Sequence, residues 1–159
     1  MQIQRWAVLL LRVSLVTLFV VLLLLQTFSF PGQFAFMAQQ HPQSAHLRWP
    51  LTFVFAFWIL CAQVVLFAIW KLLALIGANR IFTSVSMTWV DVIVRAIAAA
   101  WIILAGVLLY VGLHADDPGL PLLLFTWFIG VTVLGLLMIV MRALLRQATA
   151  LQTDMDEVI

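Results

Sequence analysis

Long apolar runs dominate the chain, and short polar stretches separate them. Four runs contain no charged residue: Val13–Phe30, Trp49–Trp70, Ala96–Leu113 and Gly119–Met141. The shortest run would form a helix about 27 Å long, close to the roughly 30 Å hydrocarbon core of a bilayer. None shows the apolar–polar alternation of membrane barrel strands, and only helices and closed barrels satisfy their backbone groups in lipid. The pattern predicts four transmembrane helices near residues 6–30, 50–76, 87–113 and 120–150.

Turn-forming residues separate these runs. Pro31-Gly32 is expected to end the first helix, because proline cannot continue the hydrogen-bond ladder. A polar outer loop should follow from Gln33 to Arg48, and a tight turn is expected at 114–119. The run from Val13 is too long for the apolar region of a signal peptide, so the first segment is expected to stay as an anchor. The predicted fold is all-α, with residues 1–159 forming a single four-helix transmembrane bundle.

Basic residues predict the orientation of the helices. An N-terminus in the cytoplasm places seven basic residues on that side: Arg5, Arg12, Lys71, Arg80, Arg95, Arg142 and Arg146. Only Arg48 then lies outside, and short loops retain positive charge on the cytoplasmic side. Four spans return the C-terminus to the cytoplasm, and the fourth helix is expected to extend into it. This predicts a multi-pass protein with both termini in the cytoplasm.

Composition excludes several classes of protein. Hydrophobic residues make up 66% of the chain and charged residues 9%, so a soluble domain could not cover its surface with charge. The net charge of +2 does not indicate direct nucleic-acid binding, because the basic residues are scattered singly instead of clustering on one stripe. The lipid bilayer is therefore the first predicted partner.

Few polar groups lie inside the predicted spans. Gln63 is near the middle of the second helix, and its amide is expected to make an interhelical hydrogen bond instead of serving transport. Asp91 and Arg95 are four residues apart in the order that stabilises a helix. No Asp, Glu, Lys or His is expected near the midplane, which disfavours a proton-coupled transporter and an intramembrane protease.

Catalysis, cofactors and metals find no support in the sequence. The three histidines, His41, His46 and His114, match no zinc-binding spacing. There is no glycine-rich phosphate loop, nucleophile elbow or Cys-x-x-Cys motif, and the polar segments are too short to hold a catalytic domain. The sequence predicts a protein that is not an enzyme and binds no cofactor or metal.

Small residues predict where helices approach each other. The third helix contains Ala96, Ala98, Ala99, Ala100, Ala105 and Gly106, and the fourth contains Gly130 and Gly135. Small side chains allow close backbone approach in lipid, so these two helices are expected to pack together. The same residues could equally serve a contact between copies in a homo-oligomer.

Two cytoplasmic segments form the predicted interaction surface. One is the connection 77–91 and the other is the acidic tail 148–159. The residues singled out are Arg80, Phe82, Ser86, Asp154, Met155, Asp156 and Glu157. An apolar stripe of Leu151, Met155 and Val158 at helical spacing is expected to pack against Ile81, Phe82 or the helix ends, so that the tail closes over the connection. The acidic groups of the tail are expected to lie close to the basic groups of the same side: Lys71, Arg80, Arg95, Arg142 or Arg146.

These two segments resemble the bacterial DUF2975 family of small four-span membrane proteins. The resemblance rests on G-x-x-R-I-F-T-x-x-S from Gly77 to Ser86 and on A-x-x-L-Q-x-D-M-D-E-V-I from Ala148 to Ile159. It implies the bacterial cytoplasmic membrane as the location. Family members are often encoded beside a small helix-turn-helix regulator, which implies a cytoplasmic protein of that kind as a partner. The resemblance implies no catalytic or binding residues.

Two classes of function follow. The first is a non-enzymatic regulatory or interaction protein that acts through 77–91 and 148–159. The alternative is a subunit of an oligomeric transporter or channel, or a small protein like those that confer immunity to membrane-active toxins. A lack of ionisable groups inside the spans favours the first class.

Overall fold

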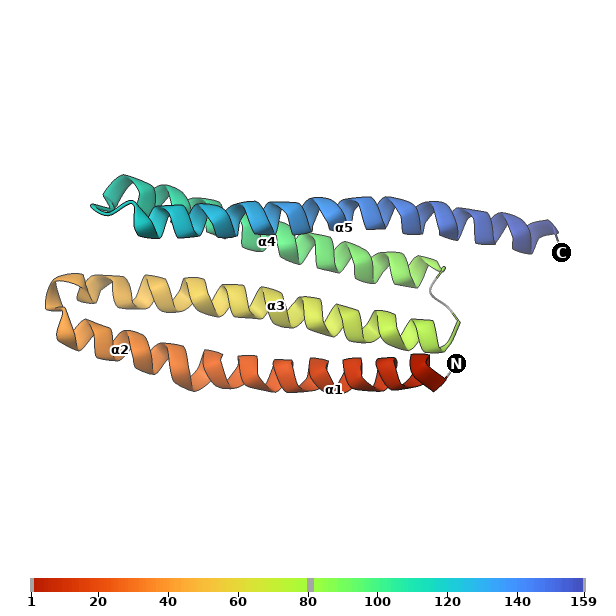
Figure 1. The fold of residues 1–159 in the computed structure, drawn as a ribbon, viewed down its shortest axis with the longest axis horizontal. Coiled ribbons are helices and arrows are strands. Elements are labelled where there is room, and N and C mark those ends of the chain that lie inside the picture. The colour runs from red at the N-terminus through yellow and green to blue at the C-terminus, as the bar shows by residue number, and fades with distance from the viewer. Residues whose placement is uncertain (1, 80–81, 159) are drawn as a thin grey trace. The chain divides into compact units, whose positions relative to one another are not determined.

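The chain is all-α in a computed structural model that describes residues 2–79 and 82–158 (Figure 1). Its elements are α1 (Gln2–Leu24), the π-helix η1 (Leu25–Ser29), α2 (Phe30–Gln40), the 3-10 helix η2 (Pro42–Leu47), α3 (Arg48–Gly77), α4 (Ser84–His114) and α5 (Gly119–Val158). Four helical stretches are long and apolar enough to cross a membrane: Gln2–Gln40, Trp49–Gly77, Ser84–His114 and Gly119–Val158. The predicted number of long apolar helices is confirmed.

The helices belong to two compact units, which are described separately. The first unit, Met1–Trp70, contains α1, η1, α2, η2 and most of α3. The second unit, Lys71–Ile159, contains the end of α3, all of α4 and all of α5.

The first helical stretch does not end at Pro31-Gly32, so this sequence prediction is wrong. The α-helix widens at Leu25–Ser29 into a π-helix and then continues as α2 to Gln40. Pro31 lies in the first turn of α2, where a missing N–H is tolerated. The π-helix η1 lets α2 begin just before Pro31, while the helical stretch continues without a break. The polar stretch expected to be a loop from Gln33 is therefore helical as far as Gln40.

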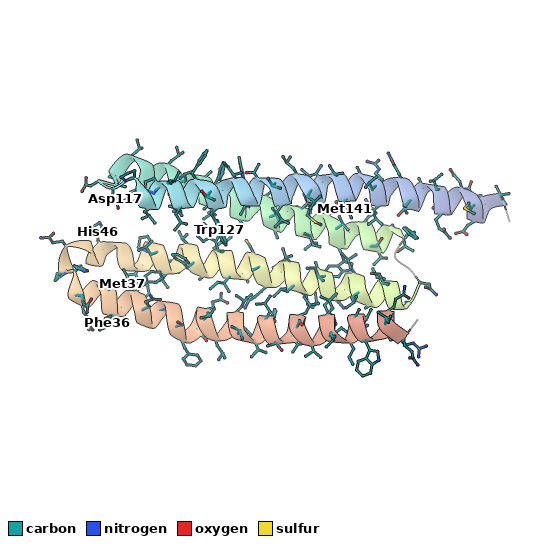
Figure 2. All side chains as sticks on the ribbon, in the orientation of Figure 1. Phe36, Met37, His46, Asp117, Trp127 and Met141 are labelled. Atoms are coloured by element: carbon teal, nitrogen blue, oxygen red, sulfur yellow. The ribbon has the colours of Figure 1, made fainter. Side chains whose placement is uncertain are left out.

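Polar and aromatic side chains connect α1, η1 and α2 to α3 within the first unit. The Gln26 amide in η1 donates a hydrogen bond to the Ala56 carbonyl oxygen of α3 at 3.3 Å. The rings of Phe34 and Phe55 lie 5.4 Å apart, and Phe55 meets Trp58 edge-on at 5.5 Å. Phe36 and Met37 lie on other faces of α2 and are exposed (Figure 2). Phe34 therefore contacts α3 from the helix that follows the π-helix.

In the second unit, α4 and α5 pack side by side as an antiparallel pair (Figure 1). The Trp101 indole N–H donates to the Thr132 hydroxyl at 2.8 Å, and the Trp101 ring stacks on Phe128 at 5.0 Å. A side-chain carbon at Gly135 would lie 3.3 Å from Ile97 Cγ2. The predicted pairing of these helices is confirmed at Gly135, where a small residue permits close approach. No side chain lies within 4 Å of the corresponding position at Gly106 or Gly130.

The turn between α4 and α5 fixes their register. Asp117 lies in this turn (Figure 2), and its carboxylate accepts a hydrogen bond from the Gly119 N–H at 3.2 Å. Trp101 lies as many residues before the turn as its partner Thr132 lies after it. Extending this register places Ser84, the first residue of α4, opposite Thr149. Residues 150–158 of α5 therefore extend past the start of α4.

In the second unit, two predicted helix limits differ from the structure by three residues or more. The helix expected from residue 87 begins at Ser84, preceded by Thr83 in an extended conformation with φ −130° and ψ 165°. The connection 77–91 is accordingly helical over its second half. The helix expected to end near 150 continues to Val158, so α5 has 40 residues.

A polar groove between α4 and α5

A groove of about 660 Å³ lies between the start of α4 and the C-terminal part of α5. From the α4 side it is lined by Phe82, Thr83, Ser84, Met87 and Asp91, and from the α5 side by Arg142, Arg146, Thr149, Thr153 and Asp156. All of these residues belong to the second unit. Charged groups and hydroxyls supply most of its lining.

Helical periodicity explains the α5 side of the groove. Its residues recur at spacings of three and four, which places them on one face of the helix. The Thr153 hydroxyl donates to the Thr149 carbonyl oxygen at 3.0 Å, as threonines in helices commonly do. The Thr149 hydroxyl oxygen is buried and has no hydrogen-bond partner among the described residues. The groove thus contains one buried hydroxyl available to a ligand or water.

An ion pair joins the two helices inside this groove. The Arg142 guanidinium contacts the Asp91 carboxylate, with 43% and 32% of the two side chains exposed. Both residues are equally distant from the turn, so the pair follows the same register as Trp101 and Thr132. The expected pairing of Asp91 with Arg95 is not found among the described residues, because Asp91 faces α5.

Only some residues of the predicted interaction surface line the groove. Phe82 and Asp156 line the groove, and Phe82 is 44% exposed. Asp154, Met155 and Glu157 are also exposed, and they lie outside the groove lining. Arg80 lies outside the described residues.

Ser86 does not fit the predicted surface. Its side chain is fully buried, and its hydroxyl donates to the Thr83 carbonyl oxygen at 2.7 Å. The same carbonyl oxygen accepts the Met87 N–H at 3.4 Å, so the hydroxyl adds a second hydrogen bond to the residue just before the first turn of α4. Ser86 serves the start of the helix instead of a partner.

The predicted closure of the tail over the connection is found only in part, because Asp156 and Phe82 line one groove whereas the apolar stripe stays exposed. The tail continues α5 as a helix, and Leu151, Met155 and Val158 are 64%, 63% and 87% exposed. Asp156 nevertheless lines the same groove as Arg142 and Arg146, so an acidic and two basic groups share this site. Ile81, the other expected contact, lies outside the described residues.

Gln63 does not make the predicted interhelical hydrogen bond. Its side chain is 6% exposed, and the Nε2 donor has no partner among the described residues. Gln26 makes the bond of this kind instead, through the Ala56 carbonyl oxygen. The widened π-turn carries Gln26, and sequence reasoning took that segment for regular helix.

The groove has the chemistry of a binding site. It presents two guanidinium groups, two carboxylates and four hydroxyl side chains, with no cysteine or histidine in the lining. In the part of the chain that the structure describes, no group of three His, Cys, Asp or Glu side chains could hold a metal ion. Charged groups and hydroxyls of this kind recognise a polar surface by hydrogen bonds and ion pairs.

A family model described as "Protein of unknown function (DUF2975)" matches residues 32–159. The match includes α3, α4 and α5 and therefore both sides of the groove, and it leaves out residues 1–31. The resemblance noted at 77–86 and 148–159 is confirmed. Comparisons with curated proteins and with solved structures each found no match.

Proposed function

The chain belongs to the DUF2975 family, whose description assigns no activity, and we propose that it is a non-enzymatic membrane protein that binds a cytoplasmic protein through the end of α5. The end of α5 is defined as residues 150–158, which extend past the start of α4. Together with the polar groove it forms the proposed docking surface. The proposal rests on the exposed apolar stripe of Leu151, Met155 and Val158 at this end.

Insertion into a membrane is the first part of the proposal. Four helices are long and apolar enough to cross a bilayer, and α5 has no buried residue although most of its length is apolar. Soluble proteins rarely expose contiguous apolar patches of more than a few hundred Å². The distribution of basic residues supports cytoplasmic termini. We propose the inner membrane of a bacterium as the location, as the resemblance noted at 77–86 and 148–159 implies.

The end of α5 supports the second part. Leu151, Met155 and Val158 form an exposed apolar stripe, and acidic groups occupy other faces of the same turns. Negative charge disfavours adsorption to an anionic membrane surface, which leaves a protein partner as the better occupant. An amphipathic helix that docks by such a stripe is a common mode of protein recognition. We propose a helix-turn-helix regulator encoded beside this protein as the partner.

Binding of the purified regulator to the full-length protein in lipid nanodiscs tests this role. Burying a methionine contributes about 1.5–3 kcal/mol, so Met155→Ser should weaken binding about tenfold or more. Leu113→Ser is the matched control, because Leu113 is also exposed and lies at the opposite end of α4. It should leave the affinity unchanged.

Two results would count against the proposal. If the wild-type protein does not bind the regulator, this partner is wrong. If Met155→Ser and Leu113→Ser weaken binding equally, the end of α5 is not the docking surface.

A further inference from the structure

An apolar groove of about 220 Å³ runs between α1 and α3 within the first unit. It is lined by Leu15, Val16, Phe19, Val20, Leu66, Phe67 and Trp70, with almost no polar surface. Leu15 is buried at its base, and Val16, Val20 and Phe67 are about half exposed along its edges. The groove is open along its length and accepts a narrow apolar group from the side.

A positive charge lies at one end of this groove. The Arg12 guanidinium carbon is 5.6 Å from the centre of the Trp70 ring, and Trp70 also lines the groove. This cation–π contact involves the charge of the guanidinium and needs no hydrogen bond from its N–H groups. No described residue forms an ion pair or accepts a hydrogen bond from Arg12. Arg12 can therefore bind an anion while it keeps its contact with Trp70.

The dimensions of the groove suit one acyl chain. Arg12 and Val20 are about 12 Å apart along α1 at about 1.5 Å per residue, which is less than half of a roughly 30 Å hydrocarbon core. The groove thus covers one leaflet, beginning at the end where the apolar run starts. Its volume is below the roughly 300–1,000 Å³ of ordinary ligand pockets, so it fits a chain segment better than a compact molecule.

We propose that the α1–α3 groove binds an apolar chain that carries an anionic head, with the chain along the groove and the head on Arg12. The proposal rests on the membrane insertion proposed above and is independent of any protein partner. Arg5, seven residues before Arg12, lies on the same face of α1 and adds positive charge near the head. The occupant is an anionic phospholipid, because Arg12 lies at the end of the groove where the apolar run starts, at the level of the headgroups.

Native mass spectrometry of the full-length protein in mild detergent, stripped of lipid, tests the proposal. The protein is offered phosphatidylglycerol and phosphatidylcholine with identical acyl chains in equal amounts. A basic group near the headgroups favours anionic lipid about fivefold, so phosphatidylglycerol should predominate on the wild-type protein by about that factor. Arg12→Gln should bring the ratio to about one. Palmitate is offered separately, and binding of palmitate that depends on Arg12 without a preference for phosphatidylglycerol would overturn the phospholipid as occupant.

Matched variants distinguish this groove from the general lipid surface. Val16→Phe fills the groove and should reduce binding of both lipids, whereas Val13→Phe adds the same bulk at an exposed position outside the lining. Arg95→Gln removes a basic residue from α4 and should leave the ratio unchanged. Circular dichroism must show wild-type helicity for each variant, and if Val16→Phe fails to fold, the comparison of Arg12→Gln with Arg95→Gln decides.

The proposal is overturned if the wild-type protein binds the two phospholipids equally. It is also overturned if Arg95→Gln abolishes the preference while Arg12→Gln retains it. A failure of membrane insertion would be detected separately, as release of the protein from membranes by alkaline carbonate.

Discussion

Two glutamine amides of the first unit differ in their hydrogen bonding. Gln26 donates to a backbone carbonyl oxygen of α3, whereas the Nε2 group of the buried Gln63 has no partner among the described residues. A hydrogen bond between membrane helices contributes only about 0.6 kcal/mol on average. An unsatisfied buried donor costs about 1–3 kcal/mol. The same residue type should therefore have opposite effects on stability at these two positions.

Replacement of each glutamine by leucine tests this difference. Gln63→Leu removes an unsatisfied donor and should raise the free energy of unfolding by about 1 kcal/mol. Gln26→Leu removes a satisfied one and should lower it by about 0.6 kcal/mol. Reversible unfolding in mixed detergent micelles measures both. A loss of stability in Gln63→Leu equal to that in Gln26→Leu would show that Gln63 has a partner after all.

The ion-pair partner of a charged residue was the feature least predictable from the sequence. Asp91 has a cation four residues away in Arg95, yet it pairs with Arg142, which is far away in the chain. Local spacing gives the neighbours on one helix, but the register between helices decides which neighbours lie across the interface. Arg142, Arg146, Thr149, Thr153 and Asp156 do share one helical face, and that periodicity could have indicated a polar surface on α5.

At the scale of the elements, the length of an apolar run is the more reliable signal. All four long helices follow from such runs, since backbone groups in lipid must be bonded within the segment. The proline rule failed at Pro31 because a π-turn removes the conflict between the ring and the preceding carbonyl group. Sequence alone does not distinguish a proline that ends a helix from one that a π-turn accommodates.

Replacing Pro31 tests the role of the π-turn. A proline inside a helix costs about 3 kcal/mol or more, and the π-turn recovers part of that cost. Pro31→Ala restores an N–H donor, so Leu25–Ser29 should return to α-helical bonding and amide hydrogen exchange near residue 31 should slow. The control is Pro121→Ala, because Pro121 lies in the first turn of α5, where the N–H is unpaired in any case. Unchanged exchange in Pro31→Ala would mean that the π-turn has another cause.

At the scale of the whole molecule, charge and helix number together predict the topology. Four spans place both termini on one side, and seven of the eight basic residues then lie on that same side. This asymmetry is a property of the sequence, so it could be read without coordinates. The groove between α4 and α5 could not be predicted from the sequence, because it depends on the extension of α5 past the start of α4.

Labelling of single cysteines in intact cells tests the topology. Gln43 lies in η2 and Met155 near the end of α5, and both side chains are exposed, so each thiol would be reactive wherever reagent reaches it. With Cys61→Ser as background, a membrane-impermeant maleimide added outside should label Gln43→Cys at once and Met155→Cys only after the membrane is opened. Seven basic residues on one side against one on the other make the reverse insertion energetically unfavourable. Labelling of Met155→Cys in intact cells, with Gln43→Cys protected, would invert the orientation and place the end of α5 beyond the reach of any cytoplasmic partner.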